Sequence, residues 1–243
     1  MKKNYIDLHT HSVLSKHAYS SLTENIEYAL SNGLKLYGIS EHQPDDVNAG
    51  AHEFAFVTGR RVTPNEINGM KILFGAEMNI LDNGFETSNH PEKLDYCIAS
   101  MHGYVYSKVH TFEQNTDNYI KAINTPYITF LGHLDYPIYK CNYEKVIKAV
   151  RDADKLIELN NASLVPNTSR IGALDIDKEI LKHCVQYKVP VIMNTDAHIK
   201  YQIGNVEYAQ KLLEEIDFPE ELIVNYNKDL IKKFFKVDID LNY

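Results

Sequence analysis

The feature that most constrains the fold is a repeated alternation of short apolar segments with longer amphipathic ones. The apolar segments have the length and residue types of buried β-strands, and the amphipathic ones have the apolar spacing of helices. This alternation predicts a parallel sheet with right-handed crossovers. Seven strands are predicted, and their nearly continuous apolar runs favour a barrel related to the eight-stranded form. The predicted strands are 5–8, 36–40, 71–78, 96–100, 127–131, 155–159 and 190–193.

Capping residues mark several of the predicted helices. Ser21 and Glu24 stand three residues apart before an apolar run, which is the pattern of a capping box. Thr116 is the expected N-cap of a helix over 116–124. The tripeptide Asp-Asn-Gly at 82–84 predicts a turn, and therefore a short hairpin or an excursion after the third strand. Further helices are predicted within 51–69 and over 143–154, 177–187, 206–216 and 227–235.

Histidines and carboxylates follow nearly every predicted strand at its carboxyl end. In a parallel barrel these ends meet on one face, where the loops form the active site. Two histidines at i and i+2 on an extended chain point to one side, so the first pair can hold a single ion. The candidate metal ligands are His9, His11, His17, His42, Glu77, His102, His133, Asp196 and His198.

The residue types of this set point to transition metals. Neutral imidazole is the commonest protein ligand for such ions, and a catalytic zinc ion takes about three protein ligands while keeping a position for water. Nine groups with a bridging carboxylate would therefore hold two or three ions. Zn²⁺ is expected, with three ions favoured, and Mn²⁺ and Fe²⁺ are alternatives. Such a cluster would attract a phosphate dianion despite the acidic chain.

Composition and charge exclude several classes of partner. The formal net charge of −8 provides no basic stripe for a nucleic-acid backbone. No apolar run approaches the roughly 20 residues of a membrane span, and a secretory signal is not expected. The three cysteines are an odd number without close pairing, which suits a reducing cytoplasm. The 243 residues are long enough for one large domain, so 1–243 is expected to be a single domain.

Together, these motifs resemble the PHP (polymerase and histidinol phosphatase) superfamily. The resemblance covers about residues 4–236 and includes the opening Asp-x-His-x-His, the Glu-His that ends the second strand, a Gly-x-Glu and a final Thr-Asp-x-His. The chain is most similar to the small stand-alone bacterial phosphatases with three zinc ions, which have Thr-His-Ala-Tyr-Ser where this chain has Lys-His-Ala-Tyr-Ser at 16–20. The family implies an α/β fold, a distorted seven-stranded (β/α)7 barrel of the TIM-like type.

The resemblance also implies how the ligands divide among ions. It assigns His9, His11, Glu77 and Asp196 to one ion, Glu77, His102 and His133 to a second, and His17, His42 and His198 to a third. The chain departs from the subgroup after the second strand, where His-Gln-Pro replaces a usual glycine. It departs again after the fifth, where His-Leu-Asp-Tyr replaces a usual His-Pro. Because these loops face the substrate, they leave its identity open.

The predicted function is a metal-dependent phosphatase that hydrolyses a small phosphomonoester through a metal-bound hydroxide in a di- or trinuclear site. The family name suggests a histidinol-phosphatase-like activity, and a small phosphorylated metabolite is the expected partner. Arg170, and either Arg60 or Arg61, are candidates for a phosphate clamp. The residues expected to act in catalysis are Glu77, Asp196 and His198.

Other functions stay open at this point. A metal-dependent phosphodiesterase or exonuclease uses a related domain, although the acidic balance counts against it. An amidohydrolase uses a similar barrel, but its usual bridging lysine is absent from these strand ends. A non-catalytic metal-binding module would keep the ligands without turnover. Asp7, two residues before His9, is expected either to orient an imidazole or to have a structural role.

Overall fold

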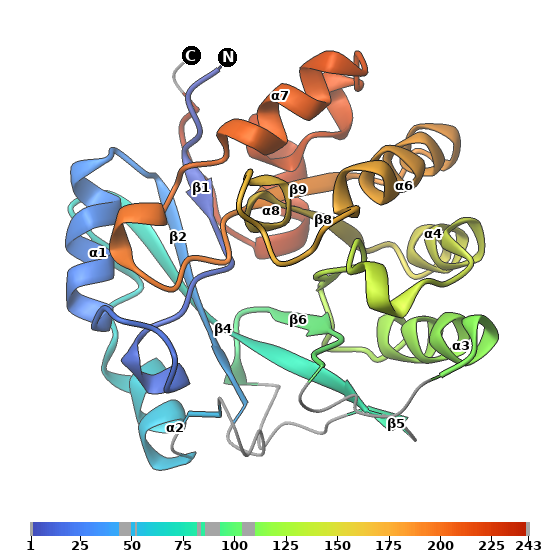
Figure 1. Cartoon of the computed structure of the whole chain (residues 1–243). Helices are drawn as coiled ribbons and strands as arrows, with labels where there is room; N and C mark the ends of the chain where they lie inside the picture. Colours follow the sequence, from blue (N-terminus) through green and yellow to red (C-terminus); the bar gives the residue numbers. More distant parts are fainter. Residues whose placement is uncertain are drawn as a thin grey trace.

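The computed structural model describes residues 2–43, 50–51, 53–81, 84–85, 93–103 and 110–241. Its centre is a mostly parallel sheet whose seven main strands are ordered β1-β2-β4-β6-β7-β8-β9 (Figure 1). The predicted number of strands is therefore confirmed. These strands are β1 (Ile6–Asp7), β2 (Leu36–His42), β4 (Met70–Leu81), β6 (Cys97–Ser100), β7 (Phe130–Leu131), β8 (Leu156–Asn160) and β9 (Val191–Asn194).

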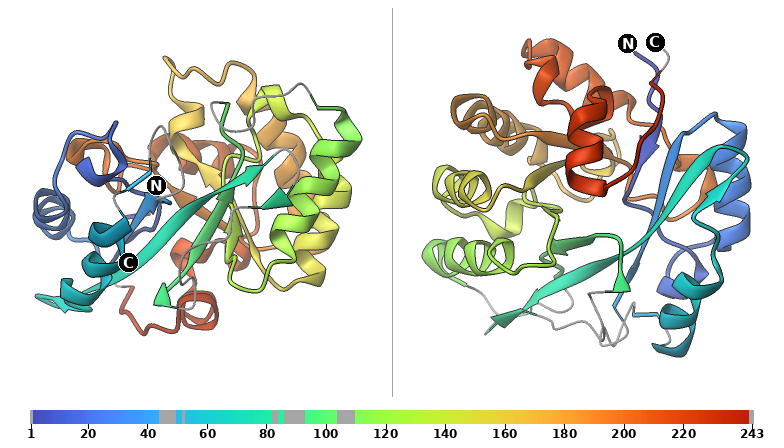
Figure 2. Two further views of the ribbon diagram at one scale, coloured as in Figure 1. Left: turned by 90° about the horizontal axis from the view of Figure 1, so that it is seen from below. Right: turned by 180° about the vertical axis from the view of Figure 1, so that it is seen from behind.

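The first and last strands approach each other, so the sheet forms a nearly closed barrel (Figure 2). A parallel bridge joins Thr10 to Ala197, just beyond the ends of β1 and β9. The backbone amide of His11 donates to the Ala197 carbonyl at 2.8 Å, and the Ala197 amide donates to the His9 carbonyl at 3.2 Å. Closure therefore occurs at the carboxyl ends, next to the first two predicted ligands.

Two short strands pair with β4 but do not belong to the path of the seven main strands. Strands β3 (Glu66–Ile67) and β5 (Gly84–Phe85) both pair with β4 in antiparallel register. Leu81 faces Gly84 in the second pair, which confirms the predicted hairpin, although its residues 82–83 lie outside the described residues.

Helices connect the strands and cover the sheet. Helices α3, α4 and α6 lie side by side along one flank, and α1 lies across the barrel from them (Figure 1). The capping box of Ser21 and Glu24 is confirmed at the start of α1. Thr116 is not a cap, because the helix begins one turn earlier, with Thr111 as N-cap and Gln114 as its partner. The bounds are α1 (Leu22–Ser31), α2 (Glu53–Val62), α3 (Phe112–Ile123), α4 (Tyr143–Asp152), α5 (Asn161–Leu164), α6 (Ala173–Tyr187), α7 (Glu207–Glu215) and α8 (Lys228–Phe235).

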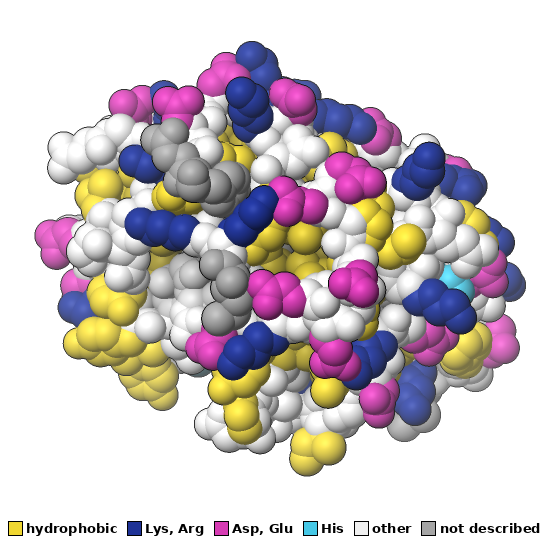
Figure 3. All heavy atoms as spheres, turned by 90° about the horizontal axis from the view of Figure 1, so that it is seen from above, with side chains coloured by type: hydrophobic (Ala, Val, Ile, Leu, Met, Phe, Trp, Pro, Cys, Tyr) yellow, Lys and Arg dark blue, Asp and Glu magenta, His cyan; other side chains and the backbone are white. Residues whose placement is uncertain are grey.

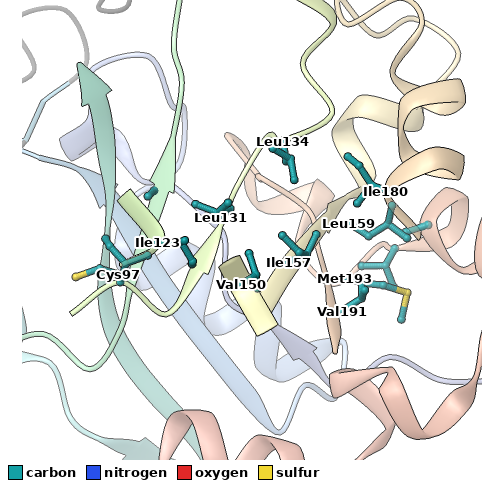
Figure 4. Packing of buried hydrophobic residues seen from close by; sticks show 14 of the residues in the cluster. Cys97, Ile123, Leu131, Leu134, Val150, Ile157, Leu159, Ile180, Val191 and Met193 are labelled. Atoms are coloured by element: carbon teal, nitrogen blue, oxygen red, sulfur yellow. The ribbon is translucent and has the colours of Figure 1, made fainter. Parts of the chain in front are cut away.

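The larger hydrophobic core lies between the outer face of the sheet and these helices. Figure 4 shows Leu131, Ile157 and Val191 of the strands packed against residues of the helices, among them Val150 and Ile180. Burying one such side chain contributes about 1.5–3 kcal/mol, so this layer holds the helices on the strands. Within the described residues, no helix is long and apolar enough to cross a membrane.

The inner face of the barrel changes in character along each strand. In β8, Leu156 belongs to a second apolar cluster, whereas Glu158, two residues on and on the same face, is a buried carboxylate. In β9, Ile192 and Asn194 follow the same order. Helix α8 closes the apolar end of the barrel. The cluster consists of Tyr5, Ile6, Leu8, Leu36, Leu73, Tyr96, Ile98, Phe130, Leu156, Ile192, Val224, Ile231 and Phe235.

Two glycines make room for Tyr96 inside the barrel. A Cβ atom at Gly75 would lie 2.5 Å from the Tyr96 ring, and one at Gly38 would lie 2.4 Å from its hydroxyl. The hydroxyl donates to the carbonyl of Leu8 at 2.7 Å. The glycine of the Gly-x-Glu motif is therefore needed for close packing. Glu77, two residues beyond it, points to the same side of β4.

Candidate active site

Glu77 lies at the centre of the predicted ligand set. It is fully buried near the carboxyl end of β4, and the ring nitrogens of five histidines lie 3.1–3.4 Å from its carboxylate oxygens. Burial alone would raise the pKa of this carboxyl group. The facing histidines outweigh that effect and hold the pKa well below its usual range, so Glu77 is ionised. The five histidines are His9, His11, His42, His102 and His133.

Asp196 is the second carboxylate of the cluster. Its oxygens lie 3.3 Å from Nε2 of His11 and 3.5 Å from Nε2 of both His9 and His133. Burial opposes ionisation, but the surrounding histidines hold the pKa of Asp196 well below its usual range. Asp196 and His133 both adopt the left-handed conformation with φ of +53°, which costs about 1 kcal/mol for a residue with a Cβ atom. The chain tolerates this conformation at both positions, where it places a side chain in the cluster.

A group of histidine rings forms one side of the site. Nε2 of His17 lies 2.6 Å from Nε2 of His198, and both rings pack near His11. Two ring nitrogens this close must share a proton or a cation. Burial, with help from the neighbouring His11, lowers the pKa of His198 to about 4. His198 is therefore neutral at neutral pH.

Residues behind the ligands hold several imidazoles in place through their second ring nitrogen. Nδ1 of His9 is 2.7 Å from Glu158, and Nδ1 of His102 is 2.7 Å from the side-chain oxygen of Asn79. Burial lowers the pKa of His9, but Glu158, Glu77 and Asp196 together raise it well above its ordinary value. Such contacts set ring orientation and tautomer in metal sites.

Sequence reasoning did not assign a role to Glu158. The available signal was a charged residue within an apolar strand segment, Leu-Ile-Glu-Leu-Asn, in phase with the inward-facing Leu156. Another glutamate that it left unused, Glu41 on β2, accepts hydrogen bonds from the hydroxyl groups of Ser12 and Ser15. That carboxylate fixes the loop that follows His11.

Of the two roles predicted for Asp7, orienting an imidazole or stabilising the fold, the structure shows the second. Its carboxylate accepts hydrogen bonds from the backbone amide of Gly204 at 2.8 Å and from the Thr195 hydroxyl at 2.5 Å. Its contact with His9 is to the backbone amide, at 3.4 Å, rather than to the imidazole. Asp7 therefore ties the first strand to the chain after β9, and Glu158 orients the ring.

The donor atoms fit divalent metal ions. Nε2 of His9, Nε2 of His11 and both carboxylate oxygens of Glu77 are buried and lack a hydrogen-bond partner among the described residues. Leaving such atoms unsatisfied costs about 1–3 kcal/mol each, and bound cations would remove that cost. Three groups have ligand atoms within 4.8 Å of one another: His11, His42 and His198; His9, Glu77, His133 and Asp196; and His42, Glu77 and His102. This grouping differs from the division that the resemblance implies, since His133 lies with His9 and Asp196.

A cavity of about 410 Å³ opens above the cluster. Seven of the nine predicted ligands line it, together with Gly103, Tyr136, Ser169 and Arg170. Nη2 of Arg170 lies 3.4 Å from a carboxylate oxygen of Asp196. The structure does not bring the other candidate arginines to this cavity. Arg61 is exposed on α2, and Arg60 pairs with Asp95 at 3.1 Å.

The fold and the site together define a class of protein. It is a nearly closed parallel barrel with a candidate metal centre of buried histidines and carboxylates at the carboxyl ends of its strands. Residues 7–169 match the family model of the PHP domain. A probable phosphatase of Clostridium acetobutylicum is 39% identical over 238 residues, which cover 96% of this chain and 95% of that protein. The chain belongs to the PHP domain family.

Solved structures agree on the fold. Histidinol phosphate phosphatase from Lactococcus lactis, complexed with zinc, L-histidinol and phosphate, has a TM-score of 0.64 and 17% identity. The match covers 90% of this chain and 95% of that one. A chain in a structure of archaeal ribonuclease P with mature tRNA has a TM-score of 0.61 and 16% identity, over 95% of this chain and 90% of that one. Since one fold occurs in such different settings, function must be inferred from the site.

Proposed function

We propose that this protein is a metal-dependent phosphatase that hydrolyses a small phosphomonoester. The observation that carries the proposal is the convergence of five imidazoles on the buried, ionised carboxylate of Glu77 beneath a small cavity that one arginine lines. The similarity to a probable phosphatase supports it, and so does the fold shared with a protein that binds zinc and phosphate. A substrate like histidinol phosphate is part of this proposal.

The three groups of donors would hold the ions. His9, Glu77, His133 and Asp196 form one, His42, Glu77 and His102 a second, and His11, His42 and His198 a third, with His17 beside it. Two or three ions can be held in this way, and Zn²⁺ is expected, with Mn²⁺ or Fe²⁺ as alternatives. Divalent ions in such a site supply positive charge to phosphoryl oxygens and lower the pKa of a water molecule.

The chain's own residues bind and orient the substrate. Arg170 offers a fixed guanidinium to the phosphoryl oxygens, a geometry suited to paired hydrogen bonds. Nδ1 of His198 contacts the Asp196 carbonyl at 2.8 Å, so Nε2 of this neutral imidazole would be the atom that holds an ion. Glu77 and Asp196 stay ionised and balance part of the positive charge. Phosphomonoester hydrolysis is the reaction that these groups serve best.

The size of the cavity supports a small substrate. About 410 Å³ lies at the lower end of the range for small-molecule sites. On the face shown in Figure 3, basic and acidic side chains are interspersed, and the basic ones do not gather there into a patch of the kind that binds nucleic acid. A phosphorylated metabolite is therefore the proposed partner.

The proposal is tested by turnover of p-nitrophenyl phosphate, bis(p-nitrophenyl) phosphate and a panel of phosphorylated metabolites, with Zn²⁺ and Mn²⁺ compared. We expect monoester turnover, and a loss of at least about 100-fold in Glu77→Gln, because one carboxylate serves two donor groups. Glu66→Gln, an exposed glutamate of β3, is the matched control. Activity of Glu77→Gln within threefold of the parent, or preferred turnover of the diester, would contradict the proposal.

We also propose a cytoplasmic protein whose residues 1–243 act as one domain. The three cysteines, Cys97, Cys141 and Cys184, are buried and free, which suits a reducing compartment. The strands of the barrel span residues 6–194, so the sheet itself has no break between domains along this range.

A further inference from the structure

Arg170 is held in place by one carboxylate of the ligand set and by side chains outside that set. Nη1 of Arg170 donates to the Ser163 hydroxyl oxygen at 3.0 Å, and Nη2 donates to Asp196 at 3.4 Å. The guanidinium carbon also lies 5.6 Å from the centre of the Tyr136 ring. Nη2 also lies 3.5 Å from Nε2 of His133, and the arginine lines the cavity.

Ser163 connects Arg170 to a buried carboxylate. Arginine can only donate, so the Ser163 oxygen accepts from it, and the single hydroxyl proton of Ser163 is free for another acceptor. Asp135 is the neighbouring carboxylate, and its charge interacts with the Arg170 guanidinium and its side chain with Ser163. Ser163 and Asp135 are 2% and 3% exposed. Both side chains are therefore excluded from water, and the Ser163 oxygen accepts from Nη1 of Arg170 at 3.0 Å.

The backbone around this network is fixed on both sides. Ser163 lies in the short helix α5, directly after β8, where Asn160 caps the helix through the amide of Ala162 at 2.9 Å. Asp135 and Tyr136 lie directly after β7, in a turn closed by the Tyr136 amide and the His133 carbonyl at 3.0 Å. The segment His-Leu-Asp-Tyr thus supplies a candidate metal ligand and two contacts of the arginine network.

We propose that Asp135 and Ser163 are positioning residues that hold the Arg170 guanidinium toward the phosphoryl group of the substrate. Neither residue lines the cavity, so both act through Arg170. This inference rests on the proposed function, since it assumes that the cavity takes a phosphoryl group. It assigns the segment after β7 a role in substrate affinity as well as in metal binding.

The test is a double-mutant cycle that separates positioning from folding. Asp135→Asn, Ser163→Ala and Arg170→Ala are prepared singly, and the first two are also combined with Arg170→Ala. For each zinc-loaded protein, zinc content, the affinity for inorganic phosphate by calorimetry, and KM and kcat for p-nitrophenyl phosphate are measured. Asp175→Asn is the control, because Asp175 is an exposed aspartate in the first turn of α6.

We expect Asp135→Asn and Ser163→Ala to weaken phosphate binding and raise KM by about 5- to 20-fold, with kcat within threefold and zinc content unchanged. In the Arg170→Ala background, either change is expected to have an effect below twofold. Asp175→Asn is expected to stay within twofold of the parent. An equal loss of affinity with and without Arg170, or a loss of zinc in the single variants, would overturn the positioning role.

The two proposals fail in different ways. If the parent turns over no phosphomonoester but binds phosphate with the coupling described above, the proposed function fails and the positioning role stands. If turnover is present while Asp135→Asn and Ser163→Ala both bind phosphate like the parent, the positioning role fails and the proposed function stands. A parent protein that binds no inorganic phosphate overturns the positioning role as well.

Discussion

The two ends of the barrel interior are built from the same strands but by opposite chemistry. At the amino ends, side chains such as Leu156 and Ile192 form an apolar cluster that α8 closes. At the carboxyl ends, the same inward direction carries Glu158, Asn194 and Asp196, and the buried oxygens of Glu77 lack hydrogen bonds within the described part of the chain. One end removes apolar surface from water, and the other buries charge that only opposite charges or cations can offset.

The difference teaches where stability and function reside. Each buried polar atom without a partner costs about 1–3 kcal/mol, so a chain that optimised stability alone would fill both ends with apolar side chains. The polar end is therefore the functional site, and the apolar end supplies the stability that offsets its cost. If this division is right, changes at the two ends should affect different measurements.

The largest effect is expected from Asp196→Asn at the polar end. Asp196 faces three histidines and carries negative charge that a neutral amide cannot replace, so turnover should fall by about 100- to 1000-fold. Turnover of p-nitrophenyl phosphate is measured in zinc-loaded protein. The control is Asp217→Asn, an exposed aspartate that also adopts a left-handed conformation. A loss of activity below fivefold would contradict a role of Asp196 in turnover.

Four residues earlier on the same chain, Ile192→Ala should have the opposite profile. The side chain is fully buried in the apolar cluster, and its truncation should lower the free energy of unfolding by about 3 kcal/mol. Turnover per folded molecule should stay within twofold of the parent. Denaturant unfolding gives the first value, and activity normalised to folded protein gives the second. Substitutions on a protein surface usually change the free energy of unfolding by less than about 0.5 kcal/mol. A change of only that size in Ile192→Ala would contradict the role of this cluster.

An intermediate effect is expected from Glu158→Gln, at the boundary between the two ends. The carboxylate lies 2.7 Å from Nδ1 of His9. Its negative charge raises the pKa of that imidazole more than the charge of Glu77 or Asp196 does. Losing it should weaken zinc binding by about 10- to 100-fold, because the ring loses its fixed orientation. Competition with a chromophoric chelator measures the affinity, with Glu144→Gln on the exposed face of α4 as the control. Equal affinities in the two variants would show that Glu158 does not orient the ligand.

The smallest effect concerns a charge at the apolar end. Lys155, directly before β8, has its pKa lowered from 10.5 to about 8 by burial, and its ammonium donates to the Thr125 carbonyl at 2.5 Å. Since the folded pKa lies below the unfolded one, the unfolded chain binds more protons between pH 8 and 10.5, and stability should rise with pH in that window. Relative to Lys155→Met, the parent should gain up to about 1 kcal/mol over this range, because the group is partly screened by solvent. A flat difference between the two unfolding curves would contradict a buried charge here.

Much of the fold could be predicted because its signals are local. The seven strands and the capping box of Ser21 depend on runs of neighbouring residues, and the structure contains them. The start of α3 was missed because two threonines, Thr111 and Thr116, compete as caps. Gln114 pairs with the first of them, whereas Thr116 donates its hydroxyl to the carbonyl of Phe112 within the helix.

The candidate site was predictable in its members but not in its internal arrangement. Strand ends identify nine polar residues, and the structure brings all nine together around Glu77 and Asp196. The choice between Arg170 and Arg61 depends on which of them the fold brings to the cavity. Both are followed by an apolar residue in the sequence, but Arg170 lines the cavity, whereas Arg61 is exposed on α2.

The sequence by itself determined three things: the presence of a parallel barrel, which residues of its strands face inward, and which strands carry a histidine or a carboxylate at their ends. Only the tertiary structure decided which imidazole meets which carboxylate, that Glu158 rather than Asp7 contacts the His9 ring, and that Ser163 accepts from Arg170. The physical reason is distance along the chain. Periodicity and capping act over a few residues, whereas these contacts join residues as far apart as His9 and Glu158 and arise only when the barrel closes.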